Sequence, residues 1–231
     1  MPRTSAQVVE ALVANAILAV LRLDDARSLV DCAQALAAGG VRTLEVTLTT
    51  PGAEAAISAL RDASPVEAPW LIGAGSVLDA DAAQRAIRAG ASFLVSPVSD
   101  GAVLAAGAAH GVPVIPGAFS PTECFAAQQR APLVKLFPAG GLGPTYLRDL
   151  LAPMPSLRIV PTGGIAIDDV GAWLGAGAVA VGLGSALVSS ALVRDGAWDE
   201  LTARARRCAA QRDAVVARAT HDNAGNREDR A

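Results

Sequence analysis

Lys135 is the only lysine of the sequence, which also contains 18 arginines, and it lies in the apolar run Leu133–Phe137. An amine buried among apolar side chains is driven toward its neutral form, which can attack a carbonyl carbon and form a Schiff base. The residue type and its setting therefore predict a covalent nucleophile. The structural alternative is a lysine whose side chain reaches from the end of a strand to solvent.

Glu45 lies in a second apolar run, Arg42–Leu48, with apolar neighbours on both sides. Alternation along a strand puts Thr43, Glu45 and Thr47 on one face. A carboxyl group buried there has a raised pKa, which a proton shuttle working near neutral pH requires. The alternative is a structural ion pair between Glu45 and Arg42 or another arginine on a strand.

Two glycine-rich segments, Pro161–Gly164 and Gly182–Ser185, each end an apolar run. Small residues let backbone amides approach an anion, and the N-terminus of a following helix adds a favourable dipole. These segments predict a phosphate site, with tight turns as the alternative. Small residues also end other runs, at Gly73–Ser76, Ser96-Pro97 and Ile115–Gly117, and Ser76 offers a hydroxyl to a substrate or a water.

These residues need strands to position them, and short apolar runs rich in β-branched residues recur about every 20 to 28 residues. Alanine-rich segments with helical periodicity separate the runs. Several of these segments begin at a capping residue and end in glycine, as helices do. The eight predicted strands are Ile17–Arg22, Arg42–Leu48, Trp70–Ala74, Ser92–Ser96, Pro113–Pro116, Leu133–Phe137, Leu157–Pro161 and Ala178–Leu183.

Continuous apolar strands that alternate with helices predict a parallel sheet, and eight such units in one domain favour a (β/α)8 TIM barrel. An open doubly wound sheet would need a glycine-rich loop after the first strand, where Leu23-Asp24-Asp25 stands instead. We expect residues 1–219 to form one barrel domain. A helix within residues 1–15 and another over Trp198–Ala219 lie outside the barrel units, and residues 220–231 are predicted to be a disordered tail.

The overall composition limits which classes of partner and cofactor the protein is expected to bind. A net charge of −3 argues against nucleic acid as the main partner, and no run of 18 apolar residues indicates a membrane span. Three separated cysteines fit a reducing, cytoplasmic compartment. The two histidines, His110 and His221, form no pair that could hold a catalytic metal, so we expect no metal or other cofactor. Cys124 has no nearby histidine and is predicted to be a packed thiol.

Six motifs occur in an order that resembles the 2-keto-3-deoxy-6-phosphogluconate (KDPG) aldolase family, which includes 4-hydroxy-2-oxoglutarate (KHG) aldolase activity. The resemblance covers approximately residues 8–210. The motifs are Leu44–Leu48, Gly73–Leu78, Ser96-Pro97, Ile115–Gly117, Val134–Pro138 and Pro161–Ile165.

The resemblance implies a class I, metal-independent aldolase, usually a homotrimer, that acts on small 2-oxo acids such as pyruvate and phosphorylated sugar acids. By position, Lys135 matches the Schiff-base lysine and Glu45 the acid/base. Thr162 matches the residue that discriminates hydroxyl stereochemistry, where gluconate-type enzymes carry threonine and galactonate-type enzymes commonly valine. Further implied substrate contacts are Ser76 (usually a threonine in the family), Pro97 and Phe137, and the implied phosphate-binding residues are Gly163, Gly164, Gly184 and Ser185.

The sequence departs from the family at Thr49, where the typical enzymes have an arginine that binds the pyruvate carboxylate. Arg22 resembles an arginine of the galactonate-type relatives, and our hypothesis is that it supplies the missing cation. The resemblance thus implies cleavage of KDPG to pyruvate and glyceraldehyde 3-phosphate, with KHG as a second substrate. The galactonate-type substrate or another 2-oxo acid is one alternative, and a non-catalytic phosphosugar-binding barrel is another.

Overall fold

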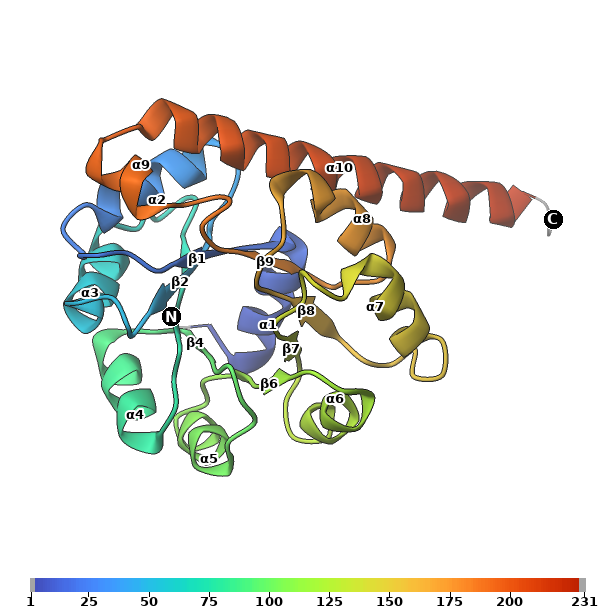
Figure 1. The fold of residues 1–231 in the computed structure, drawn as a ribbon, viewed down its shortest axis with the longest axis horizontal. Coiled ribbons are helices and arrows are strands. Elements are labelled where there is room, and N and C mark those ends of the chain that lie inside the picture. Colours follow the sequence, from blue (N-terminus) through green and yellow to red (C-terminus); the bar gives the residue numbers. More distant parts are fainter. Residues whose placement is uncertain (1–2, 229–231) are drawn as a thin grey trace.

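The computed structural model describes residues 3–228. They form an α/β fold in which curled parallel strands lie at the centre and helices surround them (Figure 1). Each predicted strand run contains a strand. The strands are β1 (Ile17–Leu21), β2 (Thr43–Thr47), β3 (Leu71–Gly75), β4 (Phe93–Val95), β5 (Val114–Ile115), β6 (Gly117–Ala118), β7 (Val134–Leu136), β8 (Ile159–Pro161) and β9 (Val181–Leu183).

The strands belong to two parallel sheets, one of six strands in the order β5-β4-β3-β2-β1-β9 and one of three in the order β6-β7-β8. The fifth predicted run differs from expectation because it gives two strands, β5 and β6, on either side of Pro116. Proline has no N–H to donate, so it interrupts the ladder. β5 pairs with β4 and β6 pairs with β7, so this segment passes from one sheet to the other.

The two sheets also contact each other through their final strands, β9 and β8. An isolated parallel bridge joins Thr162, just after β8, to Gly182 in β9. The N–H of Val179 donates to the carbonyl of Ile159 at 3.0 Å. The six-stranded and three-stranded sheets are therefore linked at both of their ends.

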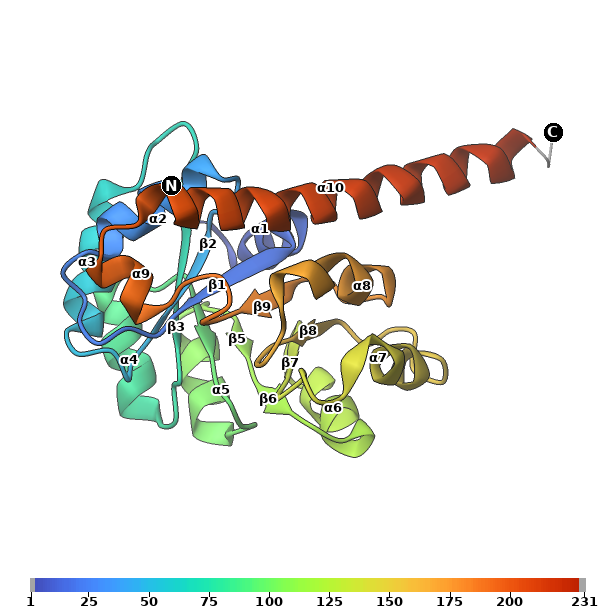
Figure 2. The same ribbon diagram turned by 45° about the horizontal axis from the view of Figure 1, so that its top comes forward.

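Helices other than α1 cover the outer side of the strands in both views (Figures 1 and 2). Two of the capping residues in the sequence cap helices in the structure: Asp79 accepts from the N–H of Ala82 at 2.7 Å, and Ser120 makes a capping box with Glu123. The helices are α1 (Ser5–Asn15), α2 (Leu29–Ala38), α3 (Ala53–Ala63), α4 (Ala80–Ala89), α5 (Gly101–Ala109), α6 (Pro121–Gln128), α7 (Gly143–Leu151), η1 (Ile167–Asp169), α8 (Val170–Gly175), α9 (Ser190–Arg194) and α10 (Trp198–Glu228).

Two apolar clusters stabilise this arrangement. The larger lies between the strands and the surrounding helices and contains Trp173 and Ile57. The smaller lies inside the curled strands, where Phe93 and Leu18 pack with residues of α1 such as Leu12. Because the strands are buried on both faces, a polar side chain on one of them costs free energy of folding unless it is hydrogen-bonded or paired.

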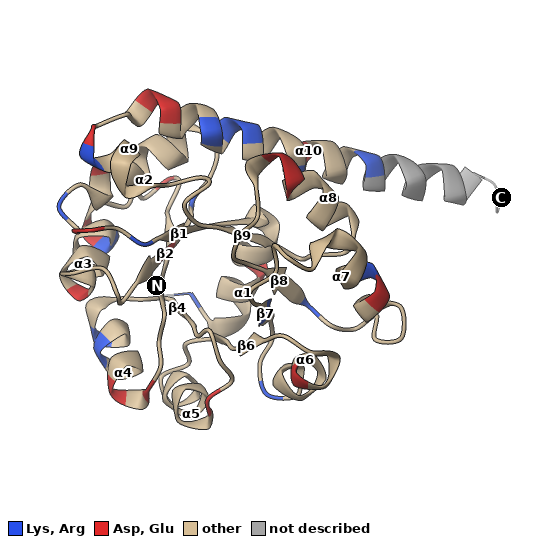
Figure 3. Cartoon of the chain, viewed as in Figure 1, with Lys and Arg blue, Asp and Glu red and all other residues tan. Residues whose placement is uncertain are grey.

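Charged residues gather on the helices and outer loops, and α10 carries both signs (Figure 3). This helix passes along α2 and α8 and then extends beyond them (Figure 2). It continues to Glu228, past the helix end predicted at Ala219 and through most of the segment predicted to be disordered; no proline interrupts it. Residues 229–231 of that predicted tail lie outside the described residues. Within residues 3–228, no helix is both long and apolar enough to cross a bilayer.

Candidate active site

Lys135 and Glu45 come from different sheets and meet in the interior. Lys135 lies on β7 and is 6% exposed, and Glu45 lies on β2 and is 1% exposed. Lys135 Nζ is 3.9 Å from Glu45 Oε1. Neither structural alternative from the sequence holds, because the lysine does not extend into solvent and Glu45 pairs with Lys135, whereas Arg42 is exposed.

The carboxylate of Glu45 has an unusual environment. Burial raises its pKa above the ordinary value of 4.5, and the charges of Lys135 and Arg22 offset part of that rise. Neither carboxylate oxygen has a hydrogen-bond partner among the described residues. Gly75 lies beside it on β3, and a Cβ there would overlap Glu45 Oε1. The missing side chain of Gly75 thus makes room for the carboxylate.

A cavity of about 600 Å³ opens above Lys135. It brings together most of the residues predicted for the site. Those lining it are Arg22, Lys135, Phe137, Thr162, Gly163, Gly164, Gly184 and Ser185. Thr49, Ser76 and Pro97 were also predicted as substrate contacts, but they do not line this cavity.

Ser76 and Thr49 nevertheless lie close to residues of the site. Arg22 Nη2 donates a hydrogen bond to Ser76 Oγ at 3.4 Å. The hydroxyl of Thr49 lies 3.0 Å from that of Thr47, the residue two positions after Glu45 on β2. A threonine at position 49 therefore turns its hydroxyl to the end of its own strand, while Arg22 lines the cavity.

Phe137 and the glycine loops form the other wall of the cavity. The ring centroid of Phe137 is 4.9 Å from Lys135 Nζ, within the range of a cation–π contact. Gly163 follows β8 with φ of 92°, and a Cβ there would come within 2.9 Å of the Phe137 ring. Glycine at this position both allows the turn and lets the loop approach the ring.

Two loops that follow adjacent strands, β8 and β9, meet at this wall. Glycines of both loops line the cavity, and η1 begins three residues after Gly164. Gly182 has no side chain, and a Cβ there would overlap the hydroxyl of Thr162. An anionic group of a ligand can therefore be bound by backbone N–H groups from two loops.

Four further residues line the cavity that the sequence did not single out: Val20, Ile165, Ala166 and Ala186. They carry no polar side chain, so residue type gives no signal. Val20 could have been inferred, because it lies two positions before Arg22 on the same face of the strand.

Among the residues whose side chains the structure describes, no group of three or more His, Cys, Asp or Glu is arranged to hold a metal ion. Cys124 is buried, as predicted, and burial raises the pKa of its thiol to about 11. A thiol in that environment stays protonated and unreactive.

The fold and the site together define a parallel α/β protein with an amine and a carboxylate beneath a cavity lined by glycine loops. The family model for KDPG and KHG aldolase matches residues 8–204, and the chain belongs to this family. The resemblance inferred from the motifs is thereby confirmed.

The individual relatives found by comparison carry names of the same family. A 2-dehydro-3-deoxy-phosphogluconate aldolase of Treponema pallidum is 38% identical over 198 residues, which cover 85% of this chain and 93% of that protein. A 2-dehydro-3-deoxy-6-phosphogalactonate aldolase of Escherichia coli is 34% identical over 150 residues, which cover 64% and 72%. A solved KDPG aldolase of Legionella pneumophila, captured with pyruvate as a covalent carbinolamine, has a TM-score of 0.76 and 30% identity over 85% of this chain and 95% of its own.

Proposed function

We propose that this chain is a class I aldolase, a carbon–carbon lyase that cleaves KDPG to pyruvate and glyceraldehyde 3-phosphate through a Schiff base on Lys135. The observation that carries the proposal is the buried Lys135–Glu45 pair beneath a cavity whose far wall consists of glycine loops. The carbinolamine held by the Legionella relative is an intermediate of this chemistry. The covalent bond to Lys135 does the work of an electron sink, so no metal or other cofactor takes part.

The reaction begins when the neutral amine of Lys135 attacks the C2 ketone of the substrate, and loss of water gives an iminium. Glu45 accepts the proton of the C4 hydroxyl, directly or through a water, and the C3–C4 bond breaks. Its electrons enter the iminium to give an enamine. Glu45 then returns a proton to C3, and hydrolysis of the new iminium releases pyruvate. A raised pKa suits Glu45 to both proton transfers.

The remaining residues bind the ends of the substrate. Backbone N–H groups of Gly163, Gly164, Gly184 and Ser185 hold the phosphate. Arg22 takes the place of the arginine absent at Thr49 and binds the pyruvate carboxylate, with Ser76 as its hydrogen-bond partner. Phe137 packs beside the bound carbon chain. Thr49 and Pro97 lie outside the cavity lining and have at most an indirect role.

A galactonate-type substrate is the second candidate, and the relative from Escherichia coli with that name supports it. Arg22 and Thr49 favour this substrate, whereas Thr162 favours KDPG. KHG, which carries no phosphate, is a further substrate of the same site. A non-catalytic phosphosugar-binding barrel is disfavoured because it would have no need of an amine and a carboxylate buried 3.9 Å apart.

The strand arrangement supports a closed (β/α)8 barrel formed by residues 1–219. The segment around Pro116 belongs to both sheets, and the Thr162–Gly182 bridge joins their opposite ends. Counting β5 and β6 as one interrupted strand gives the eight strands that such a barrel needs.

A homotrimer in the cytoplasm is the proposed setting. Exposed apolar side chains occur in the segments after three strands: Leu78 after β3, Val98 after β4 and Phe119 after β6. Phe125 on α6 is also exposed. Such residues mark a surface suited to self-association. The free, buried cysteines Cys32, Cys124 and Cys208 fit a reducing compartment.

Borohydride trapping with pyruvate tests the Schiff base. We expect one stable covalent adduct, located at Lys135 by peptide mass mapping, and none in the Lys135→Arg variant. With one lysine in the sequence, only the N-terminal amine can compete, and the peptide map separates the two. Unmodified Lys135 after trapping would contradict the proposal. Cleavage that persists in EDTA would support the absence of a metal.

A further inference from the structure

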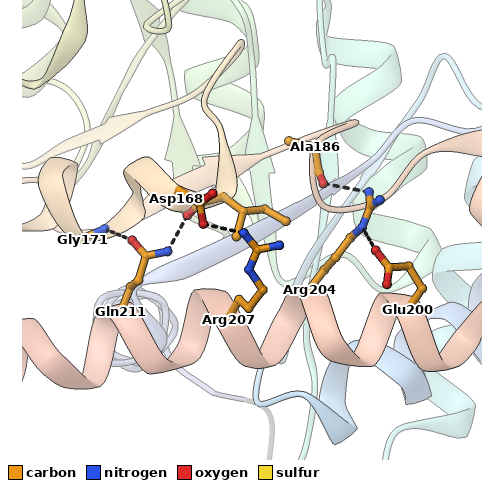
Figure 4. Close-up of polar contacts among 8 residues, drawn as sticks. Asp168, Gly171, Ala186, Glu200, Arg204, Arg207 and Gln211 are labelled. Atoms are coloured by element: carbon orange, nitrogen blue, oxygen red, sulfur yellow. Dashed lines mark hydrogen bonds and ion pairs between the residues drawn. The ribbon is translucent and has the colours of Figure 1, made fainter.

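Helix α10 bonds to the ends of both glycine loops that line the cavity (Figure 4). One loop leads from β8 through Gly163 and Gly164 into η1, and the other follows β9 through Gly184 and Ser185. Side chains of α10 reach backbone atoms of both segments. The helix itself contributes no residue to the cavity lining.

Arg204 holds the loop after β9. Its Nη1 donates to the carbonyl oxygen of Ala186 at 3.1 Å, and its Nε donates to Glu200 Oε1 at 2.7 Å, one helical turn earlier. The arginine side chain is 28% exposed, so the carboxylate of Glu200 orients a partly buried guanidinium. Ala186 lines the cavity directly after Ser185, so this bond fixes the carbonyl of the residue that follows a proposed phosphate ligand.

Gln211 holds the segment after β8. Its Nε2 donates to the carbonyl oxygen of Ile167 at 2.7 Å, and its Oε1 accepts from the N–H of Gly171 at 2.9 Å. One carboxamide thus connects η1 to the first turn of α8. Ile167 follows Ala166, which lines the cavity, so the direction in which this loop leaves the site depends on the contact.

Arg207 lies between these two residues on the same side of α10. Its Nη2 forms an ion pair with Asp168 on η1. Both side chains are exposed, so the pair adds little stability, but it offsets a carboxylate close to a loop that is to bind an anion.

The helix is well fixed where it makes these contacts. Leu201, Ala205 and Cys208 are buried along one face of α10, at the spacing expected for a helix packed on a core. At Gly39, just after α2, a Cβ would overlap that of Ala205. The close approach of the two helices gives α10 a fixed position from which Arg204 and Gln211 can act.

We propose that Arg204 and Gln211 are positioning residues for phosphate binding: they hold the two glycine loops at the separation that lets amides from both reach one phosphate. The inference rests on the proposed function, because it takes the phosphate to be bound by these loops. The family model matches only residues 8–204, so Gln211 lies outside the matched segment. The Thr162–Gly182 bridge joins the two strands where the loops begin, and the contacts with α10 hold the loops farther along the chain.

Steady-state kinetics on a phosphorylated and an unphosphorylated substrate tests this role. In Arg204→Ala and Gln211→Ala, we expect the KM for KDPG to rise about three- to tenfold, as loss of one or two hydrogen bonds predicts. The KM for KHG and both kcat values stay within about twofold of wild type. Arg204→Lys, which keeps a donor for the Ala186 carbonyl, recovers part of the KDPG affinity.

Arg212→Ala is the matched control. Arg212 is also on α10 and donates to backbone carbonyls, of Asn15 and Gly40, but at a distance from the glycine loops. We expect its ratio of KM values to equal that of the wild type. Equal rises of both KM values in the Arg204 and Gln211 variants, or no rise in either, would overturn the inference.

Calorimetric titration with inorganic phosphate separates this inference from the proposed function. The wild type and Arg212→Ala bind phosphate, and Arg204→Ala and Gln211→Ala bind it more weakly. If the wild type cleaves no aldol substrate yet shows this pattern, the proposed function fails and the positioning role stands. If phosphate binds equally to all four proteins while the wild type cleaves KDPG, the positioning role fails and the function stands.

Discussion

Glu45 Oε1 lies 3.9 Å from Nζ of Lys135, and neither carboxylate oxygen of Glu45 accepts a hydrogen bond from any residue that the structure describes. A buried polar group left without a hydrogen-bond partner costs roughly 1–3 kcal/mol, and a charged group costs more. Stability therefore does not explain a glutamate at this position. A role in proton exchange with a bound substrate explains it, because the substrate then provides the hydrogen-bond partner that Glu45 lacks.

Replacing Glu45 by Gln removes the proton acceptor and keeps the volume of the side chain. We expect kcat for KDPG cleavage to fall by about 10²- to 10⁴-fold, the range for loss of a general acid–base group. The borohydride-trapped adduct on Lys135 still forms, because its nucleophile is intact. Glu54→Gln on α3, whose carboxylate is exposed and pairs with Arg85, is the control. A Glu45→Gln variant with wild-type kcat would remove Glu45 from the mechanism.

Glu45→Gln is expected to lower activity but to raise the stability of the fold at neutral pH. Burial raises the pKa of Glu45 in the folded state, so its contribution to stability is fully present below the unfolded value of 4.5 and is lost as the pH rises through the folded pKa. Above that pKa the fold contains a desolvated carboxylate. We therefore expect Glu45→Gln to melt at a higher temperature than wild type at neutral pH, with the difference shrinking at a pH below 4.5. A lower Tm for the variant at neutral pH would mean that the ion pair with Lys135 outweighs burial.

The sequence was most informative where residue type conflicts with its surroundings. Lys135 and Glu45 are ionisable residues in apolar runs, so strand periodicity alone was enough to place both in the interior. The strands themselves follow from the same periodicity. The division of the fifth run could have been anticipated from Pro116, but which strand each half pairs with depends on the whole sheet.

Features made of backbone or of long-range contacts left no such signal. Ala166 and Ala186 line the cavity through groups that every residue has. Arg204 and Gln211 give no signal in the sequence, because their partners are carbonyls and amides some 18 to 44 positions away in the chain.

Gly75 is expected to be needed for the position of Glu45. In Gly75→Ala the new Cβ overlaps Glu45 Oε1, so the carboxylate must rotate away from Lys135. A displacement of about 1 Å at a reacting group costs on the order of 100-fold in rate, and we expect kcat to fall by that order. Gly175→Ala, where a Cβ would meet nothing within 4 Å, is the control for adding a methyl group. Unchanged kcat in Gly75→Ala would show that Glu45 works equally well from another rotamer.

Arg22 is predicted to bind the substrate carboxylate in place of the arginine absent at Thr49. Loss of a charge-assisted hydrogen bond weakens binding by roughly 1.5–3 kcal/mol, so Arg22→Ala raises the pyruvate concentration needed for half-maximal trapping by about 10- to 100-fold. Arg27→Ala is the comparison, because that exposed arginine forms an ion pair with Asp25 and lies outside the cavity. If Arg22→Ala traps pyruvate at wild-type concentrations, another group binds the carboxylate.

Thr162 is predicted to decide between the two stereoisomeric substrates. It lines the cavity, its hydroxyl donates to the carbonyl of Val160 at 3.3 Å, and the absent side chain of Gly182 leaves space beside it. In Thr162→Val the shape is kept and the hydroxyl is lost. Since one hydrogen bond contributes about 0.5–1.5 kcal/mol, we expect the ratio of kcat/KM for gluconate-type over galactonate-type substrate to fall about two- to tenfold. Thr202→Val, which removes a hydroxyl bonded to the carbonyl of Ala35 far from the cavity, should leave that ratio unchanged. A ratio that is the same in both variants and the wild type would assign the discrimination to Arg22 and Thr49 instead.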